Sequence, residues 1–152
     1  MSSEPSPVWT LRVTAVDRFA ARAAVRRRQF TISRPLDFDP AHDGITALEY
    51  ALGALAGEVV GALRVFADRR RIALEAVEAV VSGELRNPLT YLEVVGAEGD
   101  PGLARVQVKV YASSPGGEAA LRRLWDEMLE RLPLVSTFRR AGGVELHLTI
   151  TP

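Results

Sequence analysis

The apolar residues of the chain concentrate in one segment, residues 43–70. From Tyr50 to Leu63, every residue except Glu58 is apolar or small. Because a helix at a protein surface keeps a polar face, this segment predicts a central helix that is buried on nearly all sides. Its larger apolar residues recur at spacings of three and four and form the predicted core stripe, namely Ile45, Leu48, Leu52, Leu55, Val59, Leu63 and Phe66.

Glu58 is the exception in this segment and therefore the first candidate for a functional residue, since a carboxylate among apolar groups costs free energy. A second feature of the helix is the stripe Gly53, Gly57 and Gly61, spaced by four. Glycine inside a helix costs about 1 kcal/mol relative to alanine, and its usual benefit is close approach of another backbone. The stripe predicts a packed partner helix, and a second copy of the chain in a homodimer would supply one. Asp43 is the predicted N-cap.

Alternation of apolar and polar residues predicts strands on both sides of the central helix. In the strand at 103–111, Ala104, Val106, Val108 and Val110 are expected to point inward. A second, amphipathic helix is expected at 118–131, ended by Pro133. The other expected elements are strands at 9–15, 19–25, 29–33, 72–83 and 144–151 and a short helical piece at 89–95. Runs of strands with two helices on one face indicate an α+β two-layer domain.

Composition restricts the possible functions. The chain of 152 residues is long enough for one domain, predicted at 8–152 after a disordered N-terminus at 1–7. Lys+Arg and Asp+Glu number 19 each, which gives no electrostatic reason to expect nucleic acid or an anionic membrane as a partner. The sequence has no cysteine, which excludes disulfides, thiolate metal sites and cysteine nucleophiles.

Metal and membrane sites are also not expected. The loop at 36–43 contains Asp37, Asp39, His42 and Asp43, a set that could hold a divalent ion. Its spacing is not that of a binding loop we can name, and Asp43 is well explained as an N-cap, so a metal is the lesser alternative and we expect no metal or cofactor. The N-terminus lacks a secretory pattern, which predicts a cytoplasmic location, and the apolar run at 50–63 is shorter than the roughly 20 residues that a bilayer requires.

Two motifs resemble the OsmC and organic hydroperoxide resistance (Ohr) family. The segment A-L-E-Y-A-L-G-A-L-A-G-E at 47–58 is similar to a family pattern close to P-x-E-L-L-L-A-A-L-x-x-C. The segment L-P-L-V-S-T at 132–137 is similar to a second family motif, a cysteine followed by P-V and small polar residues. The resemblance spans residues 9–150. It implies an OsmC-like fold, an intertwined homodimer with its central helices packed together, sites at the subunit interface, and a role in stress response.

The departures from the family pattern bear on function. Family peroxidases use two cysteines, and the resemblance puts their positions at Glu58 and Leu132. Glu49 matches the family glutamate, while Arg18 and Arg22 are the candidates for a family arginine that orients the peroxide. Without a thiol, the protein cannot take up the peroxide oxygen and be recycled by a reductant.

Two functions are then expected, and the sequence leaves open whether the protein is an enzyme. The first is binding of a small hydrophobic or acyl-like ligand in a pocket at the dimer interface, formed by Ala54, Leu55, Leu132 and Pro133. The alternative is a non-redox enzyme in which Glu58 is the general acid or base, assisted by Glu49, Arg18 or Arg22. Glu58 in a structural ion pair with an arginine, and a pseudoenzyme that acts through protein association, remain open.

Overall fold

The computed structural model describes residues 4–151, which form two compact units. One unit extends to Ala51 and the other begins at Leu52, inside the central helix. Of the N-terminus expected to be disordered, residues 1–3 lie outside the described part, and residues 4–7 contain no helix or strand. A single domain at 8–152 stays a prediction.

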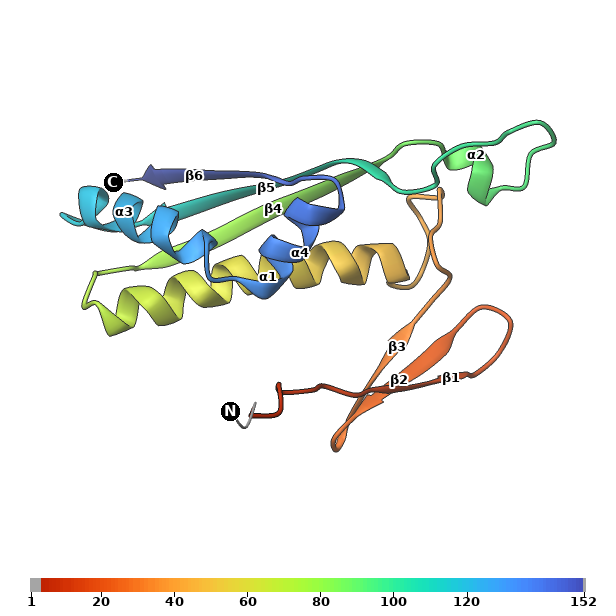
Figure 1. Cartoon of the computed structure of the whole chain (residues 1–152), viewed down its shortest axis with the longest axis horizontal. Coiled ribbons are helices and arrows are strands. Elements are labelled where there is room, and N and C mark those ends of the chain that lie inside the picture. Colours follow the sequence, from red (N-terminus) through yellow and green to blue (C-terminus); the bar gives the residue numbers. More distant parts are fainter. Residues whose placement is uncertain (1–3, 152) are drawn as a thin grey trace. The chain divides into compact units, whose positions relative to one another are not determined.

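The first unit contains a three-stranded antiparallel sheet (Figure 1). Its strands follow one another in the order β1, β2, β3, with bounds Arg12–Ala15, Ala21–Val25 and Arg28–Ile32. All three strands expected before the helix are therefore confirmed, although the first begins later than residue 9. Arg26 lies in the turn between β2 and β3 with a φ of 53°, and the neighbouring arginines are exposed. Three consecutive arginines, Arg26, Arg27 and Arg28, are thus exposed to solvent at the end of this hairpin.

The central helix, α1, runs from Ala47 to Arg69. It begins where it does because Thr46 and Glu49 form a capping box. The backbone N–H of Glu49 donates to Thr46 Oγ1 over 3.2 Å, and the N–H of Thr46 donates to Glu49 Oε1 over 3.0 Å. The prediction of Asp43 as the N-cap is wrong, because Thr46 satisfies the first helical donors and Asp43 lies in the preceding bend.

The second unit contains a mixed sheet in the order β4, β5, β6, with bounds Ala76–Leu85, Leu103–Ser113 and Glu145–Thr151. Strands β4 and β5 are antiparallel, whereas β5 and β6 are parallel. A parallel pair needs a long crossover, and α3 (Glu118–Leu129) and α4 (Pro133–Ala141) supply it. A short helix, α2 (Pro88–Tyr91), lies between β4 and β5. The α+β class is confirmed, while α4 was not expected.

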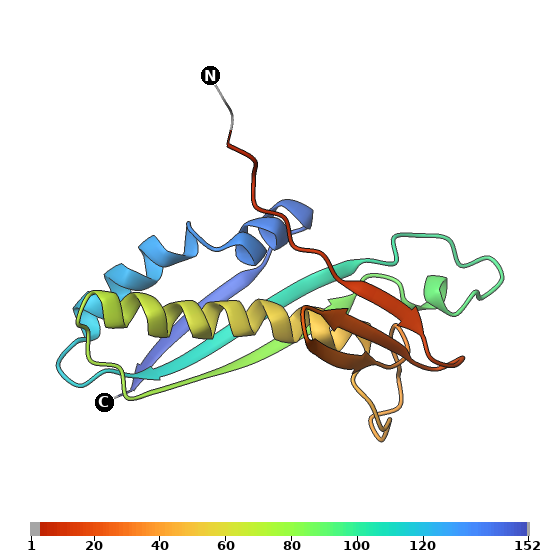
Figure 2. The same ribbon diagram turned by 90° about the horizontal axis from the view of Figure 1, so that it is seen from below.

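The core of the second unit lies between this sheet and the helices, and Figure 2 shows α1 running along the strands. The apolar face expected for α3 is buried. In β5, Val106, Val108 and Val110 point into the core, but Ala104 is exposed. The expected alternation fails at Ala104 because a bulge shifts the register between Glu84 and Leu85 of β4.

Helix α1 is buried along one stripe, formed by Leu55, Ala56, Val59, Leu63 and Ala67. The expectation of burial on nearly all sides is wrong for the single chain, and Ile45, expected in the stripe, is 53% exposed. By length and composition α1 could cross a membrane, which is weak evidence because a soluble core helix passes the same test. Leu55, Val59 and Leu63 are fully buried within the protein core.

Candidate functional site

Glu58 lies in the middle of α1, and its side chain is half-buried against the beginning of α4. Its Oε2 atom accepts a hydrogen bond of 2.8 Å from the backbone N–H of Leu134, and its Oε1 atom accepts one of 3.0 Å from Val135. These residues are the second and third of α4, so the carboxylate caps the helix N-terminus from a distant part of the chain. A negative charge at this end also interacts favourably with the helix dipole.

The local sequence of α4 explains why the cap comes from another helix. The N-cap residue is Leu132, whose side chain has no acceptor. Pro133 follows in the first helical position, where its missing N–H costs nothing. The N–H of Ser136 donates to the Leu132 carbonyl over 2.9 Å, and Glu58 accepts from the two donors between them. The N–H groups in the first turn of α4 that have no partner within the helix are therefore hydrogen-bonded to Glu58.

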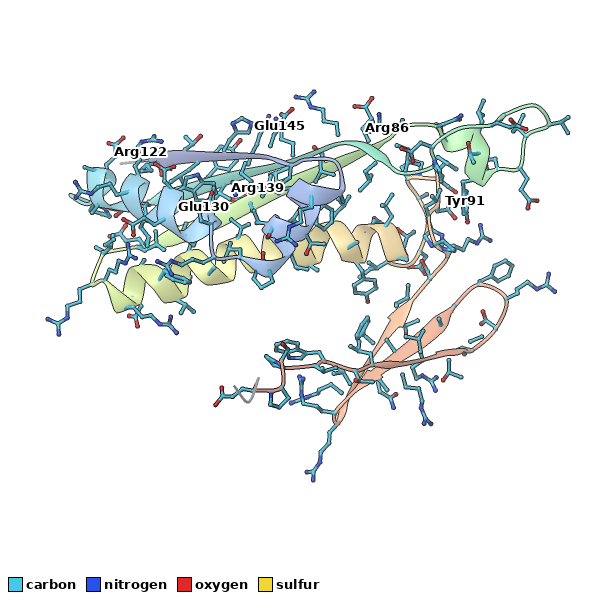
Figure 3. All side chains as sticks on the ribbon, in the orientation of Figure 1. Arg86, Tyr91, Arg122, Glu130, Arg139 and Glu145 are labelled. Carbon is cyan, nitrogen blue, oxygen red and sulfur yellow. The ribbon has the colours of Figure 1, made fainter. Side chains whose placement is uncertain are left out.

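A second interaction fixes α4 beside α3. Arg139 in the last turn of α4 and Glu130, the C-cap residue of α3, form an ion pair of 3.0 Å between Nη1 and Oε1, and Figure 3 labels both side chains. Both are substantially exposed, so water screens the pair and its contribution to stability is small. The buried Val135 and the carboxylate of Glu58 hold α4 more firmly.

Glu49, expected as a catalytic residue, lies in the first turn of α1 and takes part in the capping box. The hydrogen bond from the Thr46 backbone, followed by that with the Thr46 hydroxyl, holds the pKa of Glu49 below its ordinary value of 4.5. Its side chain thus has a clear structural role. A catalytic role for Glu49 stays a prediction.

The two candidate arginines belong to the first unit. Arg18 lies in the turn between β1 and β2, where its guanidinium stacks 5.5 Å from the centre of the Phe19 ring. Arg22 is an exposed residue of β2, paired in register with Thr14 and Thr31. Contact of either arginine with Glu58 stays a prediction.

The residues expected to form the ligand pocket fall into two groups. Leu55 and Leu132 are buried in the core, whereas Ala54 and Pro133 are exposed. A pocket formed by the four stays a prediction. The expected dimer contact at Gly53, Gly57 and Gly61 is on the exposed side of α1, with open space at each glycine.

Sequence reasoning missed the partners of Glu58, which are the backbone donors of Leu134 and Val135. Pro133 was interpreted only as the end of α3, although proline is also common in the first position of a helix. Leu132, the residue before this proline, has no side-chain acceptor and therefore cannot cap the helix that Pro133 begins. Within residues 4–151, no group of three or more His, Asp or Glu side chains is arranged to hold a metal ion.

The sequence matches no protein-family model and shows no significant similarity to a curated protein. Its structure is similar to an OsmC-like protein from Mycoplasma pneumoniae, with a TM-score of 0.75 at 17% identity over 97% of this chain and 98% of that one. An OsmC-like protein from Vibrio cholerae has a TM-score of 0.69 at 13% identity, covering 95% and 99% of the chains.

A third similar structure is the organic hydroperoxide resistance protein OhrB of Bacillus subtilis. Its TM-score is 0.57 at 20% identity, covering 94% of this chain and 98% of that one. Because these similarities extend over nearly the full length of both chains, they establish the topology. The chain has the fold of OsmC-like and organic hydroperoxide resistance proteins, built on a sequence without cysteine.

Proposed function

We propose that the protein is a cysteine-free, OsmC-fold homodimer that binds a small hydrophobic or acyl-like ligand at the dimer interface and has no thiol peroxidase activity. The observation that carries this proposal is the position of Glu58. The resemblance puts Glu58 and Leu132 at the two family cysteine positions. In this chain, Glu58 accepts hydrogen bonds from the residues that follow Leu132 by two and three positions.

A noncovalent link thus joins the two segments that carry the reactive thiols in the family. Both oxygens of Glu58 are engaged as acceptors of backbone N–H groups. A general acid or base must present an oxygen to substrate, and the backbone already occupies one of the two lone pairs on each oxygen of Glu58. The geometry therefore favours a structural role for Glu58 over the alternative of a non-redox enzyme using it as acid or base.

The exposed side of α1 supports the dimer. Apart from Arg64, its solvent-facing residues between 53 and 65 are small or apolar over three helical turns, namely Gly53, Ala54, Gly57, Gly61 and Val65. Beyond the neighbouring backbone of α1 itself, a methyl group added at any of the three glycines would meet no atom of the second unit within 4 Å. The glycines are therefore not required by packing within the chain, whereas close approach of a second α1 would account for them.

A ligand of apolar character fits the residues that surround this side of the helix. Ala54 offers an apolar surface next to Glu58, and Pro133 is exposed at the start of α4. Neither brings a charge or a hydrogen-bond donor to bind a strongly polar molecule. A cytoplasmic location and a role in stress response remain predictions that rest on the N-terminal sequence and on the resemblance.

Native mass spectrometry of the purified protein tests the proposal directly. We expect the mass of two chains, with extra mass that disappears after denaturation and is recovered as a small organic molecule in a solvent extract. A monomer at micromolar concentration would contradict the dimer. Empty dimers in independent preparations, together with no shift in melting temperature on adding a panel of fatty acids and acyl esters, would contradict ligand binding.

A further inference from the structure

The loop that connects β3 to α1 brings together Ser33, Asp37 and His42. The Ser33 hydroxyl oxygen lies 3.0 Å from Nε2 of His42, and Nδ1 of His42 lies 3.3 Å from Oδ2 of Asp37. All three belong to the first unit. They are linked in the order hydroxyl, imidazole, carboxylate, with the hydroxyl and the carboxylate on opposite ring nitrogens. This is the connectivity by which an imidazole activates a serine nucleophile.

The partners determine which ring nitrogen carries the proton in the neutral imidazole. The carboxylate of Asp37 can only accept, and it faces Nδ1 of His42 at 3.3 Å, which favours the proton on Nδ1. Nε2 then has a free lone pair, which accepts the hydrogen bond of the Ser33 hydroxyl. In this tautomer His42 is ready to remove the hydroxyl proton.

Asp37 is held firmly enough to orient the imidazole. Its Oδ1 atom accepts a 2.9 Å hydrogen bond from the backbone N–H of Asp39, and its Oδ2 atom accepts one of 3.1 Å from Arg34. The hydrogen bond from Asp39 is the main cause that holds the pKa of Asp37 below its ordinary value, assisted by the positive charge of Arg34. The side chain of Asp37 is 12% exposed.

Gly44 leaves room for this arrangement. A methyl group at Gly44 would lie 2.9 Å from Cβ of Ser33 and 3.2 Å from both the Ser33 hydroxyl and Nε2 of His42. Any larger residue would push against the hydrogen bond between them. The side of Gly44 on which a Cβ would stand thus faces the hydrogen bond between Ser33 and His42.

We propose that Ser33, His42 and Asp37 form an acyl-transfer site that hydrolyses small carboxylic esters. The Ser33 oxygen attacks the ester carbonyl carbon while its proton passes to Nε2 of His42, and the carbonyl electron pair moves to oxygen. Collapse of this intermediate breaks the bond to the alcohol oxygen, which takes the proton from His42 and leaves as the alcohol. Ser33 and His42 are the catalytic residues, and Asp37 is a positioning residue.

Water completes the cycle at the acylated serine. It gives a proton to Nε2 of His42 as its oxygen bonds to the carbonyl carbon. Collapse then releases the carboxylic acid, and the Ser33 oxygen takes the proton back. Ser33 and His42 are both only half-buried, so reagents can reach them. The proposal is independent of the ligand and dimer proposed above.

A fluorophosphonate probe tests the site, because an activated serine displaces fluoride from phosphorus and retains the phosphonyl group. We expect one adduct on the full-length protein, mapped to Ser33 by peptide mass spectrometry. It should be absent in Ser33→Ala and form about 100-fold more slowly in His42→Ala. Ser136→Ala, which removes a half-buried serine in the other unit, should label at the wild-type rate.

Hydrolysis of p-nitrophenyl acetate supplies the matching activity, and it should fall in parallel in Ser33→Ala and His42→Ala. For Asp37→Asn, the Nδ1 proton resonance of His42 should move or vanish in the NMR spectrum, while circular dichroism reports an unchanged fold. No adduct on the wild-type protein, an adduct spread over other serines, or undiminished labelling of a folded His42→Ala variant would each overturn the proposal.

Discussion

Glu58 and Leu134 are 76 residues apart in the sequence and are joined by a 2.8 Å hydrogen bond from the Leu134 backbone to the Glu58 carboxylate. With the parallel bond from Val135, it ties the middle of α1 to the start of α4. The bond gives a structural reason for a carboxylate in the least polar segment of the chain. It also determines how loss of the Glu58 carboxylate should affect the stability of the protein.

Glu58→Gln should lower the free energy of unfolding by about 1 to 2 kcal/mol, because the amide can accept only one of the two backbone bonds and turns an N–H group toward the other donor. Urea denaturation followed by circular dichroism measures this loss. The matched control is Glu78→Gln at an exposed position of β4, which should change stability by less than about 0.5 kcal/mol. Equal stability of both variants would mean that the cap contributes nothing.

The capping box of α1 should make part of the stability dependent on pH. Because the folded protein holds the pKa of Glu49 below its ordinary value of 4.5, the unfolded chain binds more protons in that range. The stabilisation by Glu49 is then complete above the unfolded pKa and is lost as the pH falls through the lower, folded pKa.

The test compares wild type with Glu49→Ala in urea at pH 7 and at pH 3. We expect the wild type to be the more stable at pH 7 and the difference to shrink at pH 3. Glu78→Ala serves as the control, with a difference from wild type that stays constant. A gap between wild type and Glu49→Ala that widens on acidification would show that the ionised carboxylate does not stabilise the box.

Gly57→Leu should weaken the proposed dimer without harming the single chain. Within the chain the position is open, and leucine is a better helix former than glycine by roughly 0.8 kcal/mol. At a close contact between two copies of α1, the added side chain should cost about 1 to 3 kcal/mol, which weakens association by roughly 5- to 150-fold.

Light scattering after gel filtration measures the mass of each variant over a range of concentrations. Arg123→Leu, at an exposed position of α3, adds the same side chain elsewhere and should leave the mass unchanged. If Gly57→Leu also kept the wild-type mass at every concentration, the glycine stripe would not be the contact.

An assay with cumene hydroperoxide and dithiothreitol should give no rate above that of buffer, because the sequence offers no thiol to form a sulfenic acid. The consumption of peroxide measures the rate, and boiled protein is the control for trace metals. Turnover that depends on both dithiothreitol and folded protein would contradict the proposed loss of peroxidase activity.

Much of the fold follows from the sequence. The periods of two and of three to four in the apolar pattern predicted most strands, the central helix and α3, because burial on one face imposes these periods on any chain. The strand at 72–83 was ambiguous by pattern and was predicted from its position after a helix that had already ended. The absence of thiol chemistry follows from composition. Helix α4 was missed because Pro133 fits both the end of one helix and the start of the next, and a short segment carries too little periodicity to distinguish them.

The tertiary structure decided the role of each polar residue. The sequence identified Glu58 as unusual but did not indicate its hydrogen-bond partners, because nearly every residue has a backbone N–H group. Only the crossover between β5 and β6 brings the N–H groups of α4 to α1. In the same way, Asp37 and His42 were predicted as a weak metal candidate. The hydrogen bond between His42 and Ser33 and the contact between His42 and Asp37 arise from the folding of a loop, where distances depend on backbone turns that no pattern of apolar residues encodes.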